Sequence, residues 1–111
     1  MIKMVYCIRK KCEMSSEEFL YHWREVHGPL GSRVPGVKRY VQNYVVLDEG
    51  RIMQSFDGIV ELWFESLDAL LLAKRSVEWK TLLEDQRNFA DHDNELYFLC
   101  EEYEVGTKLL S

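Results

Sequence analysis

The chain has 111 residues, a length typical of one domain. Hydrophobic residues make up 47% and charged residues 30%, which excludes the composition of a disordered chain. With 14 basic and 19 acidic residues the net charge is −5, which argues against nonspecific binding to nucleic acid or to an anionic membrane. We expect a single domain over residues 1–111, with a core from about residue 3 to residue 104 and a short C-terminal tail.

Targeting and redox signals are weak. The apolar runs fall far short of the ~20 residues that a membrane helix needs, and the first residues lack the layout of a signal peptide. The three cysteines are odd in number and form no Cys-x-x-Cys pair, so neither a disulfide framework nor a zinc site is indicated. We expect a soluble, cytoplasmic protein without a metal or a cofactor.

The first elements follow from periodicity and capping. A β-branched and aromatic run over residues 3–10 predicts a strand. Ser15 and Glu18 form a Ser-x-x-Glu capping box, and apolar residues then recur at helical spacing, so a helix is expected from about residue 16 to residue 27. The pair Gly28-Pro29 is expected to end this helix.

The rest of the chain is read by the same rules. Runs rich in Val, Tyr and other strand formers predict three more strands, over residues 37–47, 56–64 and 96–103. The first two of these are joined by a turn around Gly50. Ser66 can cap a helix over residues 67–74, and residues 77–89 read as a further helix or its continuation.

The element order β-α-β-β-α-β predicts an α+β fold, a ferredoxin-like sandwich with a four-stranded antiparallel sheet and helices on one face. The third predicted strand carries large apolar groups on both faces, with Val60, Leu62 and Phe64 alternating against Ile59, Glu61 and Trp63. An uncovered face would expose an apolar patch that soluble monomers rarely tolerate. We therefore expect a homodimer through the sheet faces, although the pattern leaves open which face is the interface.

Several segments resemble one known family. The segment Phe19-x-x-His22-Trp23-x-x-x-His27-Gly28-Pro29-Leu30 is similar to the EthD family of dimeric α/β-barrel proteins. Later segments resemble the same family in its order, namely Pro35-Gly36 followed by Tyr40-Val41-Gln42-Asn43, the run from Phe56 to Phe64, and Glu84-Asp85-x-x-x-Phe89-x-Asp91. The likeness extends from about Val5 to Tyr103. It implies a dimeric barrel that binds a small aromatic or polyketide-like compound between the sheet and its helices.

The resemblance implies less about the reaction, because one fold hosts many activities. The family includes a protein linked to ether-degrading oxygenase systems, fungal polyketide-tailoring decarboxylases and a methylmuconolactone isomerase. His27 and Tyr40 match pocket positions of the isomerase. Leu62 stands where that enzyme has a cysteine, which puts chemistry dependent on a thiol in doubt here.

The two histidines of the first helix differ in their expected position. His27 lies about 50° from the centre of the apolar stripe, so its imidazole, the group best suited to move protons near neutral pH, can face the sheet. A structural histidine bonded to a loop carbonyl is the alternative. His22 lies on the opposite edge of the stripe, and in an α-helix the two rings diverge by about 140°, so a metal clamp is not expected.

Polar groups on the middle strands suggest a pocket. Tyr40 and Gln42 share one face of the second predicted strand, and a second set, Asp57, Glu61 and Trp63, shares one face of the third. If these faces meet under the first helix, they form an apolar pocket with a few polar groups. Burial between Ile59 and Trp63 would raise the pKa of Glu61 and suit it to acid or base work. The alternative is an ion pair with Arg39 or Lys38 at the dimer interface.

The leading hypothesis is a small cofactor-independent enzyme that decarboxylates, dehydrates or isomerises an aromatic or polyketide-like acid, lactone or ketone. The expected catalytic residues are His27, Tyr40 and Glu61, and the expected ligand contacts are His22, Trp23, Gln42, Asp57 and Trp63. Four residues of the second helical region resemble the family's signature there and are expected to be structural, namely Trp79, Asp85, Phe89 and Asp91. The alternatives are a non-catalytic binding or accessory protein of an oxygenase pathway and a cofactor-free oxygenase acting on an electron-rich phenol.

Overall fold

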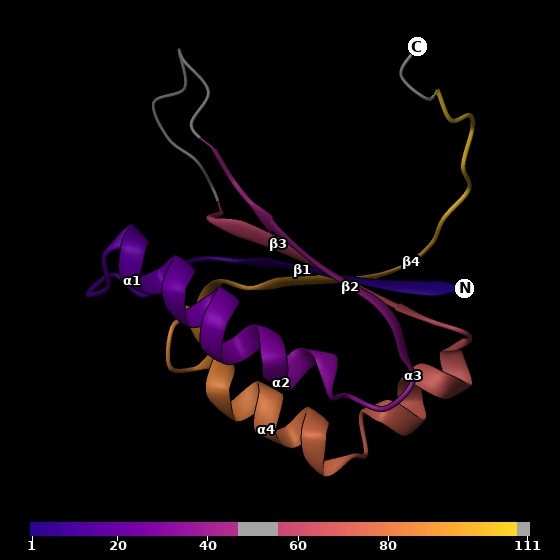
Figure 1. Ribbon diagram of the computed structural model, residues 1–111, viewed down its shortest axis with the longest axis horizontal. Coiled ribbons are helices and arrows are strands. Elements are labelled where there is room, and N and C mark those ends of the chain that lie inside the picture. Colours follow the sequence, from indigo (N-terminus) through magenta and orange to yellow (C-terminus); the bar gives the residue numbers. More distant parts are fainter. Residues whose placement is uncertain (47–55, 109–111) are drawn as a thin grey trace.

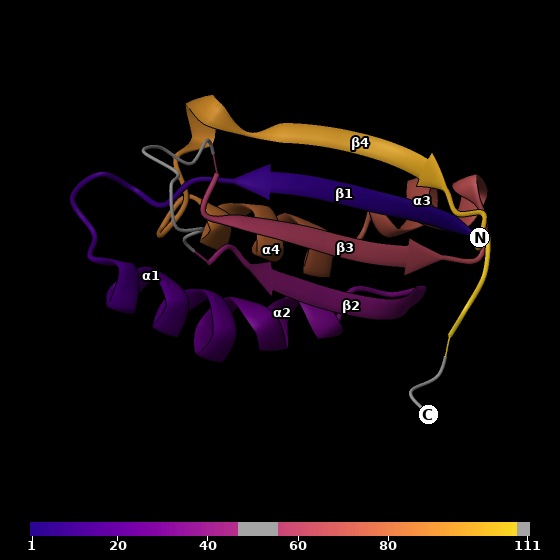
Figure 2. The ribbon, with the colours of Figure 1, turned by 90° about the horizontal axis from the view of Figure 1, so that it is seen from above.

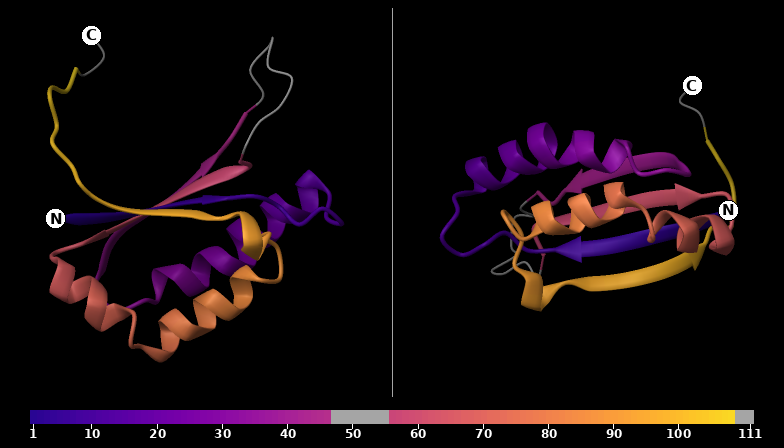
Figure 3. Two further views of the ribbon diagram at one scale, coloured as in Figure 1. Left: turned by 180° about the vertical axis from the view of Figure 1, so that it is seen from behind. Right: turned by 90° about the horizontal axis from the view of Figure 1, so that it is seen from below.

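The computed structural model describes residues 1–46 and 56–108. One antiparallel sheet with the order β2-β3-β1-β4 is built from β1 (Ile2–Ile8), β2 (Val37–Tyr44), β3 (Gly58–Phe64) and β4 (Leu96–Glu101). All helices lie on one face of this sheet (Figures 1 and 3). The predicted ferredoxin-like α+β fold is confirmed, whereas the turn expected around Gly50 lies outside the described residues.

Serine caps set the starts of the helices. The helical segments are α1 (Ser16–Tyr21), η1 (His22–His27), α2 (Gly28–Ser32), α3 (Leu67–Ala73), α4 (Val77–Gln86) and the short η2 (His92–Asn94). The predicted capping box is present, since Ser15 accepts from the Glu18 N–H and Glu18 accepts from the Ser15 N–H. Ser66 caps α3 as expected, and Ser76 caps α4, so residues after 76 form a separate helix.

The expected end of the first helix at Gly28-Pro29 is wrong, because the helical path continues to Ser32. The segment η1 is π-helical, with the Gly28 N–H donating to the carbonyl of Trp23 five residues earlier. Pro29 then falls in the first turn of α2, where its missing N–H removes no hydrogen bond of that segment. The wide turn therefore accommodates a residue pair that usually stops a helix.

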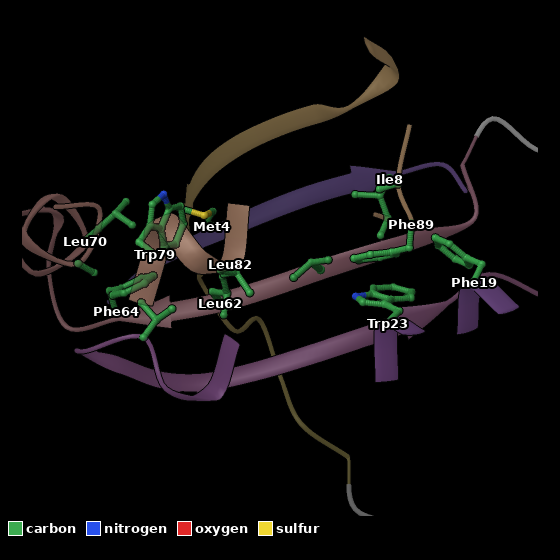
Figure 4. Close-up of a cluster of buried hydrophobic side chains, with 14 residues drawn as sticks. Met4, Ile8, Phe19, Trp23, Leu62, Phe64, Leu70, Trp79, Leu82 and Phe89 are labelled. Atoms are coloured by element: carbon green, nitrogen blue, oxygen red, sulfur yellow. The ribbon is translucent and has the colours of Figure 1, made fainter. Parts of the chain in front are cut away.

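One face of the sheet is covered by the helices and the other is not (Figures 1 and 2). Val60, Leu62 and Phe64 of β3 point toward the helices and are buried in the core that Figure 4 shows. Leu62 pairs with Met4 on one side and with Tyr40 on the other, so the even-numbered residues of β1 and β2 share this face. The odd-numbered residues of β3 lie on the face that Figure 2 views from above, where no helix covers them.

The uncovered face is apolar along its middle and at one edge. Val5 and Ile59 lie opposite Phe98 and Cys7 in the strand register, and Phe98 at the edge is 49% exposed. After β4 the chain leaves the sheet on the side away from the helices (Figure 1). Within the described residues no helix is long and apolar enough to cross a membrane.

Gly58 is required for the packing of the first helical region on the sheet. A Cβ atom at this position would lie 2.3 Å from the six-membered ring of Trp23, whose side chain is fully buried. We predict that Gly58→Ala lowers the free energy of unfolding by about 1–3 kcal/mol through overpacking. Urea denaturation measures the loss, and Gly106→Ala, where no atom lies within 4 Å, is the control. Equal stability of both variants would contradict this tight contact.

Candidate functional site

The buried histidine of η1 is held by a carboxylate from α4. His27 is 3% exposed, and its Nδ1 lies 2.8 Å from Oδ2 of Asp85. An ionised carboxylate only accepts hydrogen bonds, so Nδ1 carries the proton and the lone pair lies on Nε2. In the described part of the chain Nε2 makes no hydrogen bond. This arrangement leaves a neutral imidazole with one free basic nitrogen.

The same carboxylate also holds the second histidine. His22 Nε2 lies 2.9 Å from Oδ1 and 3.1 Å from Oδ2 of Asp85. The expected divergence of the two rings is therefore wrong, because the π-helical turn joins residues five apart and brings both rings to one side of the helix. An α-helix would have placed His22 and His27 on different faces.

Phe89 fixes the ring planes of this histidine pair. Its fully buried ring stacks on His22 with the centroids 5.0 Å apart, and meets the ring of His27 in a T-shaped contact at 4.7 Å. Asp85 lies in the last turn of α4, and Phe89 lies in the turn that follows this helix. The end of α4 and the turn after it thus supply an acceptor and a packing surface to η1.

The electrostatics favour an ionised carboxylate beside a neutral imidazole. Burial lowers the pKa of His27 below its ordinary value, and the hydrogen bond and charge of Asp85 only partly oppose this effect. Burial raises the pKa of Asp85, but hydrogen bonds from His27, His22 and Asn88 outweigh it and leave that pKa below the ordinary value. A proton arriving on Nε2 of His27 would be stabilised by the adjacent negative charge.

A second polar group on the same side of the sheet comes from β2. Gln42 Nε2 donates to the carbonyl of Trp23 at 2.9 Å and to the hydroxyl of Tyr40 at 3.0 Å. The Gln42 carbonyl accepts from the Tyr44 hydroxyl at 2.7 Å, and that hydroxyl accepts from Nε of Arg24 at 3.2 Å. A directed chain of hydrogen bonds therefore runs from a surface cation to the half-buried Tyr40.

Tyr40 lies tightly under α2. A Cβ atom at Gly31 would be 2.4 Å from the Tyr40 ring, so a glycine at this helical position lets the ring approach. Burial raises the pKa of Tyr40, and the hydrogen bond from Gln42 and the nearby indole of Trp23 lower it only in part. Tyr40 is therefore a neutral hydroxyl near neutral pH.

Glu61 and Trp63 do not share a face with Tyr40, which corrects the expected pocket. Glu61 lies on the uncovered face, where its carboxylate accepts from Lys3 and Asn43, both at 2.9 Å. Burial raises its pKa, but these hydrogen bonds outweigh burial, so the pKa lies below the ordinary value, opposite to expectation. The proposed partners Arg39 and Lys38 are replaced by Lys3 as the ion-pair partner.

The other two residues expected beside Glu61 are also away from His27. Trp63 lies on the uncovered face between Lys3 and Arg39, whose cations are 5.3 and 4.6 Å from its ring. Asp57 precedes β3 and its carboxylate accepts from the Lys10 N–H at 2.8 Å. The predicted alternation holds for Tyr40 with Gln42 in β2 and for Glu61 with Trp63 in β3. The register of the two strands places the second pair on the opposite side of the sheet from the first.

The structure thus gathers His22, Trp23, His27, Tyr40 and Gln42 on the helix side of the sheet and adds residues that the sequence reasoning had read otherwise. Asp85 and Phe89, which the sequence pattern predicts to be structural, both contact His27. Their spacing of four residues in the motif Glu84-Asp85-x-x-x-Phe89 is the sequence feature that points to a shared position. Among the described residues no group of three metal-binding side chains is present. A surface depression of about 660 Å³ at the start of α4 is lined by Lys74, Arg75, Lys80 and Arg87, among others, and includes none of the site residues.

Comparisons with known proteins agree with this architecture. A model of the EthD domain matches residues 11–93. An ethyl tert-butyl ether D (EthD) family protein from Bacillus halodurans has 21% sequence identity and a TM-score of 0.78, covering 93% of this chain and 100% of its own. No curated protein sequence matches the chain significantly.

Two further solved structures are similar at lower identity. A dimeric ferredoxin-like protein of unknown function from Thermobifida fusca is 12% identical with a TM-score of 0.69, covering 89% of this chain and 88% of its own. SnoaB, a cofactor-independent oxygenase from Streptomyces nogalater, is 12% identical with a TM-score of 0.65, covering 94% of both chains. At these identities the likeness shows the fold alone.

The protonation state of His27 predicts a pH-dependent stability. Its pKa is lower in the folded than in the unfolded chain, so the unfolded state binds more protons below about pH 6.5. The free energy of unfolding is therefore expected to fall as the pH drops from 7 to 5.5. The lowered pKa of Asp85 acts in the same direction but in a separate, more acidic window.

Urea denaturation at several pH values checks this prediction. His27→Gln is expected to flatten the slope between pH 7 and 5.5, whereas His92→Gln, at an exposed position in η2, is expected to leave it unchanged. The slope rather than the absolute stability is compared, because His27→Gln also removes packing against Phe89. A slope unaffected by His27→Gln would contradict the assigned protonation state.

Proposed function

Since the chain belongs to the EthD family, we propose that it binds a small aromatic or polyketide-like molecule between the sheet and the helices and catalyses cofactor-independent proton transfer on it. One observation carries this proposal: His27 is buried, its Nδ1 is fixed by Asp85, and its Nε2 is free to act as a base. Buried, oriented imidazoles of this kind are suited to general acid and base catalysis.

The proposed step begins with a carbon acid next to a carbonyl group. Nε2 of His27 takes the proton, the electron pair moves into the carbonyl as an enolate, and the Asp85 carboxylate stabilises the imidazolium that forms. The hydroxyl of Tyr40 donates to the enolate oxygen. When the enolate is conjugated with a carbon–carbon double bond, return of the proton from the imidazolium to the far carbon gives isomerisation. When a hydroxyl stands β to the carbonyl, the imidazolium gives the proton to that hydroxyl, which leaves as water, and the product is the dehydrated alkene. For a β-keto acid, Nε2 first takes the proton of the carboxyl group, carbon dioxide leaves to give an enolate, and the imidazolium then protonates the enolate carbon.

His27→Gln tests the catalytic role. We predict a loss of turnover by roughly 100- to 10,000-fold with the bound molecule retained, because glutamine keeps a polar group but cannot act as a base near neutral pH. Purified wild type, His27→Gln and the control His92→Gln are incubated with host metabolite extract, washed, and analysed for retained molecules by mass spectrometry. An altered compound on wild type and its unaltered precursor on His27→Gln are expected.

The same experiment separates the alternatives. If the protein is a non-catalytic carrier or accessory protein, wild type, His27→Gln and His92→Gln would all retain the same unaltered compound. His27→Gln would then differ from wild type only in its affinity for that compound. An oxygenase, an activity that the similar SnoaB carries, would consume oxygen with an electron-rich phenol, which an oxygen electrode detects. Proton-transfer chemistry predicts no such uptake.

We also propose that two copies of the chain associate through the uncovered sheet face. The proposal is supported by the apolar side chains of Val5, Ile59 and Phe98 on this face, which no element of one chain covers in the described residues, and by the dimeric state of the similar Thermobifida fusca protein. Burial of this face would also cover the exposed side chain of Phe98 on β4.

Phe98→Glu tests this interface. We predict that the wild type sediments as a dimer and that Phe98→Glu sediments as a monomer, since a carboxylate would be buried without a partner. Leu72→Glu, at a 69% exposed position on α3, is the control and is expected to stay dimeric. Sedimentation velocity distinguishes these outcomes, and a dimeric Phe98→Glu would rule out this face.

A further inference from the structure

We infer that the indole N–H of Trp23 and the hydroxyl of Tyr40 form a two-donor site for one negatively polarised oxygen of the ligand. The oxygen would belong to a planar carbonyl, enolate or phenolate group. This inference rests on the proposed function, because it assigns the donors for the ligand oxygen that becomes the enolate oxygen in the proposed step. It adds Trp23 as a second hydrogen-bond donor and gives Arg24 and Tyr44 positioning roles.

The orientation of the Gln42 amide leaves the Tyr40 hydrogen free. The carbonyl of Trp23 only accepts, so the Gln42 nitrogen must face it, and the Gln42 oxygen must then accept from Tyr44. The second hydrogen of that nitrogen is directed at the Tyr40 oxygen. Tyr40 therefore acts as an acceptor within the chain, and among the described residues its own hydrogen has no acceptor.

Trp23 supplies the second free hydrogen. Its side chain is fully buried, and Nε1 has no hydrogen-bond partner in the described residues, although buried indole N–H groups usually find one. The nitrogen lies on the side of the ring toward Leu62 and away from Phe19 (Figure 4). Leu62 is the register partner of Tyr40, so both free donors are on the same part of the helix-facing sheet.

The Trp23 ring is held in place by its neighbours. The edge of its ring system meets Tyr44 with centroids 5.1 Å apart, Phe19 packs at 5.5 Å, and Gly58 leaves the notch that its six-membered ring fills. The indole therefore cannot turn to seek an acceptor without breaking this packing. A fixed, desolvated donor is strongest toward an acceptor that carries negative charge.

The hydrogen-bond chain from Arg24 explains why the preferred acceptor is negatively polarised. Arg24 donates to Tyr44, Tyr44 to Gln42, and Gln42 to Tyr40, so each donor in the chain is polarised by the cation at its head. This makes the Tyr40 hydroxyl a better donor. Glu61, the carboxylate once expected beside Tyr40, lies on the opposite face and does not repel an anionic oxygen here.

The test uses two probes of similar shape, 4-nitrophenolate, which carries the anionic oxygen, and 4-nitrotoluene, which lacks it. Each is titrated into wild type, Tyr40→Phe and Tyr97→Phe, and the indole N–H signals are followed by NMR spectroscopy. Tyr97→Phe is the matched control, because it removes a hydroxyl that accepts from Lys74 on the same sheet face, outside the proposed site.

We expect 4-nitrophenolate to move the Trp23 indole proton downfield and 4-nitrotoluene to leave it in place. Tyr40→Phe is expected to weaken 4-nitrophenolate binding by roughly tenfold or more and to change 4-nitrotoluene binding by less than twofold. Tyr97→Phe is expected to bind both probes like wild type. Together these results support the two-donor site.

Other outcomes overturn it in distinguishable ways. Binding of both probes without a Trp23 shift, or a Trp23 proton in contact with a buried water that neither probe displaces, overturns the two-donor site and leaves the His27 chemistry standing. Failure of wild type to bind either probe overturns the two-donor site together with the ligand pocket on which the proposed function depends. Loss of turnover in His27→Gln is measured independently of all these results.

Discussion

The Asp85 carboxylate is the contact on which the arrangement of the site depends. It accepts from His22 and His27, which lie five residues apart, and only the π-helical geometry of η1 presents both rings to one acceptor. The carboxylate comes from α4, so this one group joins the first helical region to the last. Removing it would leave a buried imidazole without its partner and would free the ring plane that Phe89 helps to set.

The second constraint is the alternation of the sheet. Because side chains of a strand point to opposite faces in turn, the register of β2 on β3 separates two sets of polar groups. Tyr40 and Gln42 are half-buried on the helix side of the sheet. Glu61 falls on the other side, where it is neutralised by Lys3. The same alternation therefore places the candidate site residues Tyr40 and Gln42 on the helix side of the sheet and the ion-paired Glu61 on the uncovered side.

Much of the fold followed from local signals in the sequence. The four strands, the Ser15 capping box and the Ser66 cap each depend on a few neighbouring residues, and the structure confirms them. His27 and Tyr40 were identified from their chemistry and from a family resemblance, and the structure places them on one side of the sheet. These features were accessible because they are fixed by short-range periodicity or by residue type.

The incorrect predictions concern features that depend on contacts between distant parts of the chain or on an irregular helical turn. Reading Gly28-Pro29 as a helix stop concealed the π-helical turn and hence the pairing of His22 with His27. The pairing of β2 with β3 depends on register across a connection that the sequence does not fix, so Glu61 was placed beside Tyr40. Asp85 was read as structural because its two partners lie about 60 residues away in the chain.

The charged groups around Trp63 have a consequence for whatever covers the open face. Lys3 and Arg39 flank the indole, while Glu61 and Glu102 accept from Lys3, so two cations and two anions lie within one small cluster. Their formal charges cancel inside a single chain. A partner surface that packs here consequently meets no net field from this cluster, and its affinity is expected to vary little with ionic strength. Shape and apolar contact, rather than charge, would then select what binds.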